Sequence, residues 1–271
     1  MSKKILRGAV LGYPIAHSLS PTLHKAAFNL LGIAGEYSAI EVKSGELKNF
    51  LENKGSDFDY FSLTMPLKEE ALDLDIAIDE LGKRIQSLNT LIRRETGWSA
   101  TSTDGSGFIQ ALANAGYQQF DKVLILGAGG TARAVAGALD GLAGSVDVMR
   151  RSVRRSPAIA ACFRTTECNF LDWDDLVDIS GYQLVVNTTP SGAADLVAEN
   201  LPREVSGLLF DVLYKPWPTL LAQRWSDAGG AILNGFELLL YQGIDQLALV
   251  SGADVKVIAE ELRKTLAKAI I

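Results

Sequence analysis

The chain has 271 residues, of which 48% are hydrophobic and 21% are charged, and its formal net charge is −6. This composition is typical of a globular protein of one or two domains. The acidic balance argues against sequence-independent binding of DNA or RNA, which requires a basic face. No run approaches the ~18 apolar residues that span a bilayer. We therefore expect neither a nucleic-acid partner nor a membrane-embedded segment.

The cysteines and the N-terminus indicate where the protein works. The chain has two cysteines, Cys162 and Cys168, which are not in a CxxC arrangement. No metal site is therefore expected, and packing residues in a reducing compartment are the simple interpretation. The apolar run at residues 5–11 is too short and too mixed for a signal peptide. We expect a cytoplasmic protein without a metal ion.

Apolar runs alternate with amphipathic segments from the start of the chain, which favours an α/β fold. The first strand is expected at residues 5–12. Ser20 followed by Pro21 predicts an N-cap and the first position of a helix. That helix carries an apolar face of Leu23, Ala26, Ala27, Leu30 and Leu31. Further along we expect a strand at 36–42, a helix at 46–52, a strand at 60–64, a helix from Pro66, a strand at 88–94 and a turn at 96–97.

A second α/β unit is expected from about residue 103. Its apolar strand at 122–126 is typical of a central parallel strand. We predict a substrate-binding and catalytic domain over residues 1–102, to which residues 236–271 return, and a Rossmann-like dinucleotide-binding domain over 103–235. The remaining predicted elements are helices at 104–115, 132–142, 236–250 and 255–269 and strands at 145–149, 184–186, 208–212 and 231–233.

A glycine-rich turn follows the strand at 122–126. Residues 127–132 read GAGGTA and fit the G-x-G-x-x-G/A pattern of dinucleotide sites. Gly127 would make the tight turn, Gly129 would let a pyrophosphate approach the backbone, and Ala132 would let the helix pack on the sheet. Because a strand precedes the turn and a helix follows it, we favour dinucleotide binding over a merely structural turn. The expected cofactor contacts here are Gly127, Ala128, Gly129, Gly130 and Thr131.

The end of the next strand predicts which dinucleotide binds. NAD sites usually carry an acid there for the ribose 2′-hydroxyl. Here Asp147 lies inside the strand, and the strand end reads MRRSVRR at residues 149–155. Guanidinium groups suit a 2′-phosphate, and a solvated basic helix start is the poorer alternative because cations there oppose the helix dipole. We expect NADP, held by Arg150, Arg151, Ser152 and Arg155.

Small polar residues collect at junctions in the first half of the chain, where ligand-binding groups gather in α/β proteins. Lys68 is the most informative of them. It follows Pro66 and so falls in the first turn of a helix, where the helix dipole disfavours a cation. A surface lysine paired with Glu69 or Glu70 is the ordinary alternative. We favour a functional role for Lys68 in proton transfer.

These stretches together resemble the shikimate dehydrogenase family over nearly the whole chain. Residues 12–24 read GYPIAHSLSPTLH, which matches the family's opening motif G-x-P-x-x-H-S-x-S-P-x-x-H. The family's N-V-T-x-P-x-K motif appears at residues 62–68 as SLTMPLK. Other matching segments are Asn89-Thr90, Ser102-Thr103-Asp104, Arg150-Arg151-Ser152, Asn187-Thr188-Thr189-Pro190, DVLYKP at 211–216 and GFELLLYQ at 235–242.

The resemblance implies reversible, NADPH-linked reduction of 3-dehydroshikimate to shikimate, a step of chorismate and aromatic amino-acid biosynthesis, with the active site in a cleft between two domains. It implies that Lys68 and Asp104 form the catalytic pair. It implies a substrate carboxylate held by Ser18 and Ser20. Around the ring it implies Thr64, Asn89, Tyr214 and Gln242, and at the cofactor it adds Thr188, Thr189, Val212, Gly235 and Leu238.

The chain departs from the family pattern at several positions. Ser62, Ser102, Lys25 and Arg150 stand where the family has asparagine, and Leu238 stands where it often has methionine. Ser102 bears most on specificity because it lies two residues before Asp104. Both members of the expected catalytic pair are present.

Three alternatives stay open at this stage. A relative acting on quinate, or on both polyols, with NAD is the closest, although the arginine cluster disfavours NAD. A non-catalytic NADP-binding regulator is the second, and the intact Lys68 and Asp104 argue against it. A hydrolase using His17 and Ser18 is the third, but no Asp-His-Ser set or G-x-S-x-G elbow accompanies them, so we expect His17 to be held by backbone groups. We expect a monomer or homodimer.

Overall fold

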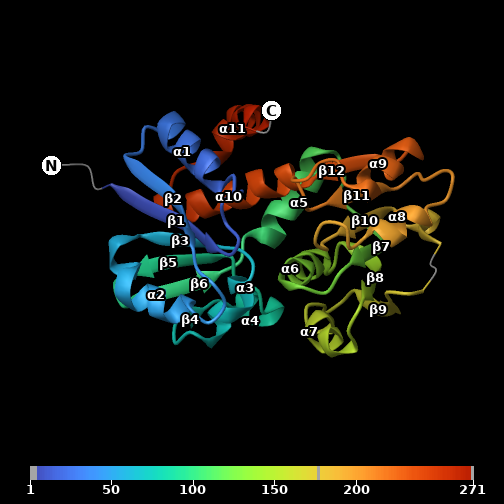
Figure 1. The fold of residues 1–271 in the computed structure, drawn as a ribbon, viewed down its shortest axis with the longest axis horizontal. Helices are drawn as coiled ribbons and strands as arrows, with labels where there is room; N and C mark the ends of the chain where they lie inside the picture. Colours follow the sequence, from blue (N-terminus) through green and yellow to red (C-terminus); the bar gives the residue numbers. More distant parts are fainter. Residues whose placement is uncertain (1–4, 176–177, 270–271) are drawn as a thin grey trace. The chain divides into compact units, whose positions relative to one another are not determined.

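The computed structural model describes residues 5–175 and 178–269, and the chain divides into two compact units (Figure 1). Unit 1 comprises Met1–Gly107 and Leu239–Ile271, and unit 2 comprises Phe108–Leu238. Both divisions fall inside helices, α5 (Asp104–Asn114) and α10 (Gly235–Ser251). The sequence patterns put the divisions close to the starts of these same two helices.

Unit 1 is built on a mixed six-stranded sheet. Its strands are β1 (Leu6–Gly12), β2 (Gly35–Glu41), β3 (Tyr60–Leu63), β4 (Ala77–Ile78), β5 (Thr90–Arg94) and β6 (Gly97–Thr101). The order across the sheet is β2-β1-β3-β5-β6-β4. Strand β1 pairs in parallel with β2 and β3, whereas β5 runs antiparallel to both β3 and β6. The carboxyl ends of β1 and β3 therefore lie beside the start of β5.

Helices from both ends of the chain complete unit 1. Its other helices are α1 (Ser20–Leu31), α2 (Leu47–Lys54), α3 (Leu67–Glu70), α4 (Glu80–Ile85) and α11 (Ala259–Lys268). Helix α11 packs on α1, so the red C-terminal helix of Figure 1 lies beside the blue N-terminal one. One apolar core joins sheet residues such as Leu11 and Phe61 with Leu47 and Leu67 of two helices.

Unit 2 has a wholly parallel six-stranded sheet. Its strands are β7 (Phe120–Leu126), β8 (Ala143–Arg150), β9 (Glu167–Asp172), β10 (Leu184–Asn187), β11 (Leu208–Asp211) and β12 (Ala231–Asn234). The order is β12-β11-β10-β7-β8-β9. From the central strand β7, the chain adds β8 and β9 on one side and then β10, β11 and β12 on the other. This is the doubly wound Rossmann arrangement, in which ligands bind at the carboxyl ends of the strands beside the switch between β7 and β10.

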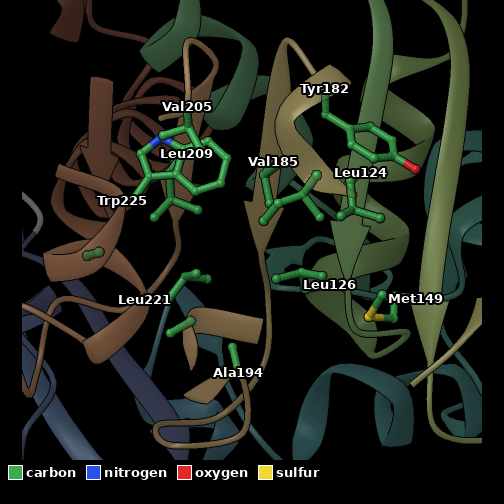
Figure 2. Packing of buried hydrophobic residues seen from close by; sticks show 13 residues of the cluster. Leu124, Leu126, Met149, Tyr182, Val185, Ala194, Val205, Leu209, Leu221 and Trp225 are labelled. Carbon is green, nitrogen blue, oxygen red and sulfur yellow. The ribbon is translucent and has the colours of Figure 1, made fainter. Parts of the chain in front are cut away.

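The core of unit 2 explains why its strands are apolar on both faces. Helices α6 (Gly130–Leu139), α7 (Ser156–Ala160), α8 (Asp195–Glu199) and α9 (Leu220–Asp227) belong to this unit. Figure 2 shows Trp225 beside Leu209 and Val205, and Tyr182 beside Leu124. The Trp225 indole is fully buried and donates to the carbonyl of Gly207 at 3.1 Å, so its polar atom is satisfied.

Two local predictions for helix α1 are wrong. The helix begins at Ser20 itself, and the preceding Leu19 makes no side-chain cap. The reason is that the Ser20 amide donates to the Ser18 hydroxyl at 3.3 Å, so the turn-forming serine is Ser18. The apolar face is also rotated, because His24 and Phe28 are buried whereas Leu30 is exposed.

Several elements escaped prediction because their sequence signals are weak. Strand β9, with the sequence ECNFLD, lies at an edge of its sheet and is only half-buried, so its pattern mixes polar and apolar residues. Strand β4 has only two residues. The other elements that were not predicted are β6, α4, α7, α8 and α9.

Candidate functional site

Lys68 and Asp104 form a close ion pair in unit 1. The Lys68 Nζ lies 2.5 Å from Asp104 Oδ2, and the two side chains are 18% and 5% exposed. Lys68 is the second residue of the four-residue helix α3, which follows Pro66. Asp104 is the first residue of α5. Two helix starts thus bring together residues 36 positions apart in the sequence. Because both charges are largely removed from water, each depends on the other for stabilisation.

Asn89 fixes the second oxygen of the Asp104 carboxylate. Its side-chain amide donates to Asp104 Oδ1 at 2.7 Å and to the Thr103 hydroxyl at 3.0 Å. Its carbonyl oxygen accepts from the Thr90 hydroxyl at 2.7 Å and from the Thr103 backbone amide at 2.8 Å. Asn89 is 2% exposed, so its side chain is held inside the protein and the carboxylate has one orientation.

Gln242 joins this group from helix α10. Its Oε1 accepts from the Asn89 amide at 3.3 Å, and its Nε2 donates to the carbonyl of Leu239 at 2.9 Å. Helix α5 approaches closely here, since a Cβ on Gly107 would lie 2.5 Å from the Gln242 backbone nitrogen. Glycine is therefore required at position 107. We call Lys68, Asn89, Thr103, Asp104 and Gln242 the Asp104 cluster.

Thr64 and the loop after β1 lie at the carboxyl ends of strands β3 and β1. The Tyr13 amide donates to the carbonyl of Met65 at 2.9 Å, which links the loops after β1 and β3. A Cβ on Gly12 would lie 2.4 Å from the Thr64 side chain, so Gly12 makes room for Thr64. Ser18 is partly exposed and Ser20 is buried.

His17 does not behave as expected from sequence. It is exposed and makes no hydrogen bond to any residue in the described ranges, so the idea that backbone groups hold it is wrong. The buried histidine is His24, whose Nδ1 lies 2.7 Å from the Tyr60 hydroxyl. Burial lowers the pKa of His24 from 6.5 to about 3, and a smaller effect of the Gln246 side chain opposes that shift. His24 is neutral at physiological pH.

Glu70, one of the two glutamates expected as ordinary partners of Lys68, is engaged elsewhere. The Glu70 carboxylate accepts from the backbone amides of Gly45 and Leu47 at 2.9 and 3.0 Å. It therefore holds the start of α2, and Asp104 is the carboxylate bonded to Lys68.

The Ser102 hydroxyl is buried and has no hydrogen-bond partner among the residues that the structure describes. Ser102 is 4% exposed. A serine at this position is too short to join the hydrogen bonds around Asp104, although it lies only two residues away along the chain.

In unit 2 the glycine turn has the geometry that the sequence predicts. Gly127 has a φ of +105°, and a Cβ there would lie 2.7 Å from the Thr188 hydroxyl. A Cβ on Gly129 would meet nothing within 4 Å, so the space above this residue is open. Helix α6 begins at Gly130, and Ala132 is fully buried against the sheet. The amides of Ala128, Gly129, Gly130 and Thr131 thus surround a helix N-terminus that suits an anion.

Arg150 has partners inside unit 2. It ends β8 opposite Asp172 of β9, and its guanidinium pairs with that carboxylate. It also donates to the Ser156 hydroxyl at 2.6 Å and to the carbonyl of Leu171 at 3.1 Å. Its side chain is 10% exposed. Arg150 therefore ties the end of β8 to β9 and to the start of α7.

The residues after Arg150 are exposed. Arg151, Ser152, Arg154 and Arg155 all face solvent. Arg151 and Arg154 make no hydrogen bond or ion pair with any residue of the described part of the chain. We call residues 150–155 the arginine loop. Its exposed cations follow the second strand of the Rossmann sheet, which is where a ribose 2′-phosphate binds in such folds.

Asp147 cannot take the role of a ribose-binding acid. It lies inside β8, is 7% exposed, and accepts from the Tyr182 hydroxyl at 2.5 Å. Lys122 lies 3.5 Å from the same carboxylate. The Asp147 carboxylate is thus bonded to neighbouring residues of unit 2 and is not free to bind a ligand. Its position before two apolar residues of the strand predicts this burial.

Four further expected cofactor residues line the carboxyl ends of β10, β11 and β12. The Thr188 hydroxyl donates to the carbonyl of Leu126 at the end of β7, and the Thr189 hydroxyl donates to Asn187 Oδ1, at 2.7 Å each. A Cβ on Gly235 would lie 2.1 Å from the carbonyl of Val212, so these two loops touch. Tyr214 lies in unit 2 beside Phe236, with ring centres 5.5 Å apart, and Leu238 is buried in α10.

Sequence reasoning missed Gln246, which is fully buried and bonds to the backbone of Asn89 and to Thr90. A signal was available, because Gln246 lies four residues after Gln242 and so on the same face of α10. No group of three or more potential metal ligands was found among the described residues. Within those ranges no helix is long and apolar enough to cross a bilayer.

The chain is similar to known proteins over almost its whole length. Residues 10–91 match the model of the shikimate dehydrogenase substrate binding domain. The chain is 35% identical over 274 residues to the shikimate dehydrogenase (NADP(+)) of Methanosarcina acetivorans, covering 96% of this chain and 97% of that one.

Two solved structures share the fold over almost the whole chain. Shikimate dehydrogenase from Mycobacterium tuberculosis superposes with a TM-score of 0.86 at 31% identity, covering 97% of this chain and 99% of that one. Shikimate 5-dehydrogenase from Thermus thermophilus, solved in complex with NADP(H) and shikimate, gives a TM-score of 0.81 at 33% identity, with 96% and 99% covered.

Proposed function

Because this chain belongs to the shikimate dehydrogenase family, we propose that it catalyses the reversible, NADP-linked interconversion of shikimate and 3-dehydroshikimate. The observation that carries the proposal is the Lys68–Asp104 pair, whose atoms lie 2.5 Å apart with Asp104 buried and Lys68 partly exposed. An ammonium largely removed from water and held by a buried carboxylate is expensive to maintain for stability alone, and it suits a reaction that must move a proton.

The fit of unit 2 to the cofactor supports NADP. The glycine turn leaves open space above Gly129 at a helix N-terminus, which accommodates a pyrophosphate. Arg151 and Arg154 offer exposed guanidinium groups after β8, while Asp147 is buried and bonded to Tyr182. Bound NADPH supplies the hydride that reduces the ketone carbon.

The residues of unit 1 supply the proton chemistry. In the reductive direction, negative charge develops on the ketone oxygen as its carbon receives hydride, and the Lys68 ammonium donates a proton to that oxygen. One hydride and one proton thus convert the ketone to the alcohol. Asp104 holds the lysine in position and stabilises its charge. In the oxidative direction the same lysine accepts the hydroxyl proton.

Substrate binding follows the same assignment. We propose that Ser18 and Ser20 bind the carboxylate of the substrate and that Thr64, Tyr214 and Gln242 contact the ring and its hydroxyls. Asn89 differs from these, because its amide already bonds to Asp104 and Thr103. Val212, Gly235 and Leu238, with Thr188 and Thr189, are proposed for the nicotinamide side of the cofactor.

The proposal includes the cellular setting. The free thiols of Cys162 and Cys168 support a reducing cytoplasm. We propose a monomer or homodimer that acts on a small molecule and binds no nucleic acid. Light scattering on the purified protein checks the oligomeric state.

A steady-state assay tests the central claim. Shikimate oxidation with NADP⁺ should proceed readily, whereas quinate with NAD⁺ should be a poor combination. Activity only with quinate and NAD⁺ would overturn the assignment. NADPH binding without turnover of either polyol would instead indicate a regulator.

Replacing Lys68 with alanine then tests the role of the lysine. Turnover should be nearly abolished, while NADPH affinity, measured by cofactor fluorescence, should stay close to that of the wild type. Equal losses of turnover and affinity would contradict a role in proton transfer.

A further inference from the structure

We propose that Tyr37, Ser62, Gln246 and Thr90 are positioning residues, which orient the Asp104 carboxylate through a one-directional chain of hydrogen bonds that ends at Asn89. The inference rests on the proposed function, since it assigns these side chains to the Lys68–Asp104 chemistry. The chain joins β2, β3, β5 and α10, and all of it lies within unit 1.

The direction of the first bonds follows from the number of hydrogens available. Ser62 has one hydroxyl hydrogen, which it donates to Gln246 Oε1 at 2.6 Å. The Tyr37 hydroxyl, 2.5 Å from Ser62 Oγ, must therefore be the donor to Ser62. Burial raises the pKa of Tyr37, with a smaller opposing effect from Ser62, so the phenol keeps its proton.

Backbone groups fix the orientation of both amides in the chain. Gln246 Nε2 lies 3.2 Å from the carbonyl of Asn89, which can only accept a hydrogen bond, so this end of the amide is the nitrogen. Asn89 Oδ1 receives the Thr103 backbone amide, which can only donate. Neither amide can therefore be reversed without losing a backbone bond.

The remaining bonds run the same way. Gln246 donates to the Thr90 hydroxyl at 2.9 Å, and Thr90 donates to Asn89 Oδ1 at 2.7 Å. Asn89 then donates to Asp104 Oδ1 at 2.7 Å. Every donor points towards the carboxylate, and the other carboxylate oxygen receives Lys68.

Burial makes this arrangement effective. Tyr37, Ser62, Thr90, Asn89 and Gln246 are each 5% exposed or less. In such a medium, hydrogen bonds that point the same way polarise and strengthen one another. Because Asn89 has no freedom to reorient, the Asp104 carboxylate keeps the geometry that holds the Lys68 ammonium. Ser62, one of the positions that depart from the family motif, is the link that joins Tyr37 to Gln246.

The decisive experiment compares two substitutions of Thr90. Thr90→Val keeps the shape and removes the hydroxyl, whereas Thr90→Ser keeps the hydroxyl. We expect Thr90→Val to lower kcat about tenfold, the order of one lost hydrogen bond, with KM for shikimate within about twofold of the wild type. Thr90→Ser should recover most of the loss. Ser62→Ala and Tyr37→Phe should have smaller effects, in that order, because they act at greater distance.

A matched control separates positioning from stability. Thr166 is also a buried threonine, and its hydroxyl donates to the carbonyl of Ala143 in unit 2 at 3.1 Å. Thr166→Val should lower the melting temperature and leave kcat unchanged. If Thr90→Val behaves like Thr166→Val, or if Thr90→Ser is as impaired as Thr90→Val, the four residues only support packing and the proposal is wrong.

A second readout does not depend on which substrate is correct. The ¹³C resonance of the Asp104 carboxyl, observed by NMR in the ligand-free protein, should shift in Thr90→Val and hold its position in Thr90→Ser. An unchanged resonance in Thr90→Val overturns the positioning role even if the enzyme is active. Absence of shikimate turnover in the wild type, together with a shifted resonance, refutes the proposed function and leaves the hydrogen-bond chain intact.

Discussion

The two regions proposed to act on substrate and cofactor are built on opposite principles. The Asp104 cluster of unit 1 is buried apart from the partly exposed Lys68, and its charged and amide groups bond to one another. The arginine loop of unit 2 is exposed from Arg151 onward, and Arg151 and Arg154 make no ion pair or hydrogen bond with any described residue. A side chain that must meet a transition state in one geometry works best when the fold already holds it in that orientation. A cation that attracts a phosphate does not need a fixed orientation, because Coulomb attraction acts over a longer range.

The largest expected effect comes from breaking the buried region. Asp104→Asn leaves the Lys68 ammonium without its carboxylate, although the shape of the side chain is kept. We expect kcat to fall by a factor of roughly 100 or more, within the range of a lost proton-transfer group. The Kd of NADPH should change little. Steady-state kinetics and fluorescence titration measure both, and a loss confined to KM would show that the carboxylate only binds substrate.

A smaller effect should follow from the exposed region. Arg151→Gln removes one guanidinium from the arginine loop and should weaken NADPH binding about tenfold, as expected for a solvent-exposed charge-assisted contact. The affinity for NADH should be unchanged, since NADH lacks the 2′-phosphate. The difference between wild type and variant should shrink at high salt. Equal weakening of both cofactors would contradict a contact to the 2′-phosphate.

Arg150 belongs to the arginine loop, but its side chain is held by hydrogen bonds like those of the Asp104 cluster. Its guanidinium is held by Asp172, Ser156 and Leu171, which indicates that it supports the loop. If so, Asp172→Asn should loosen the loop and raise the KM for NADP⁺ a few-fold. If Arg150 instead binds the phosphate directly, Asp172→Asn frees the guanidinium and the KM falls. The sign of the change decides between a supporting and a contacting arginine.

The smallest expected effect on activity lies at Asp140, which belongs to neither region. Burial would raise the pKa of this carboxyl, but hydrogen bonds from Thr165, Arg164 and Thr166 outweigh it and lower the pKa from 3.8 to about 2. A carboxyl with a depressed folded-state pKa adds stability above its unfolded pKa, and this stability is lost as the pH falls through the folded value.

Asp140→Asn should therefore melt at a lower temperature than the wild type at neutral pH, with unchanged kcat. The gap between the two melting temperatures should narrow between about pH 4 and about pH 2. Thermal melts across that range measure it. A gap that stays constant with pH would show that the hydrogen bonds do not depend on the charge of Asp140.

The glycine turn illustrates what could be predicted from local sequence. Its requirements are a positive φ at Gly127, open space at Gly129 and a small residue at Ala132, and each depends on atoms close by. The burial of Asp147 was predictable for the same reason, from its place before two apolar residues of a strand. The contacts of Arg150 were not predictable, because its partner Asp172 lies on β9, a strand whose mixed pattern gave no signal.

The residues of the Asp104 cluster were named through the family resemblance, and their bonding was decided by the fold. Lys68 and Asp104 are 36 positions apart, and Gln246 bonds to Thr90 across 156 positions. The spacing of these residues in the sequence does not predict that the Asn89 amide donates to Asp104. It also does not predict that the Ser102 hydroxyl has no partner among the described residues. The resemblance likewise gave no indication that His17 is exposed.

By itself the sequence determined the α/β class, the strand, turn and helix of the dinucleotide site, and the positive charge that follows the second Rossmann strand. These features depend on backbone dihedral angles, side-chain size and charge within a few neighbouring residues. Only the tertiary structure decided which polar groups share hydrogen bonds. Those bonds form between strands and helices that the order of the sheet and the close approach at Gly107 bring together.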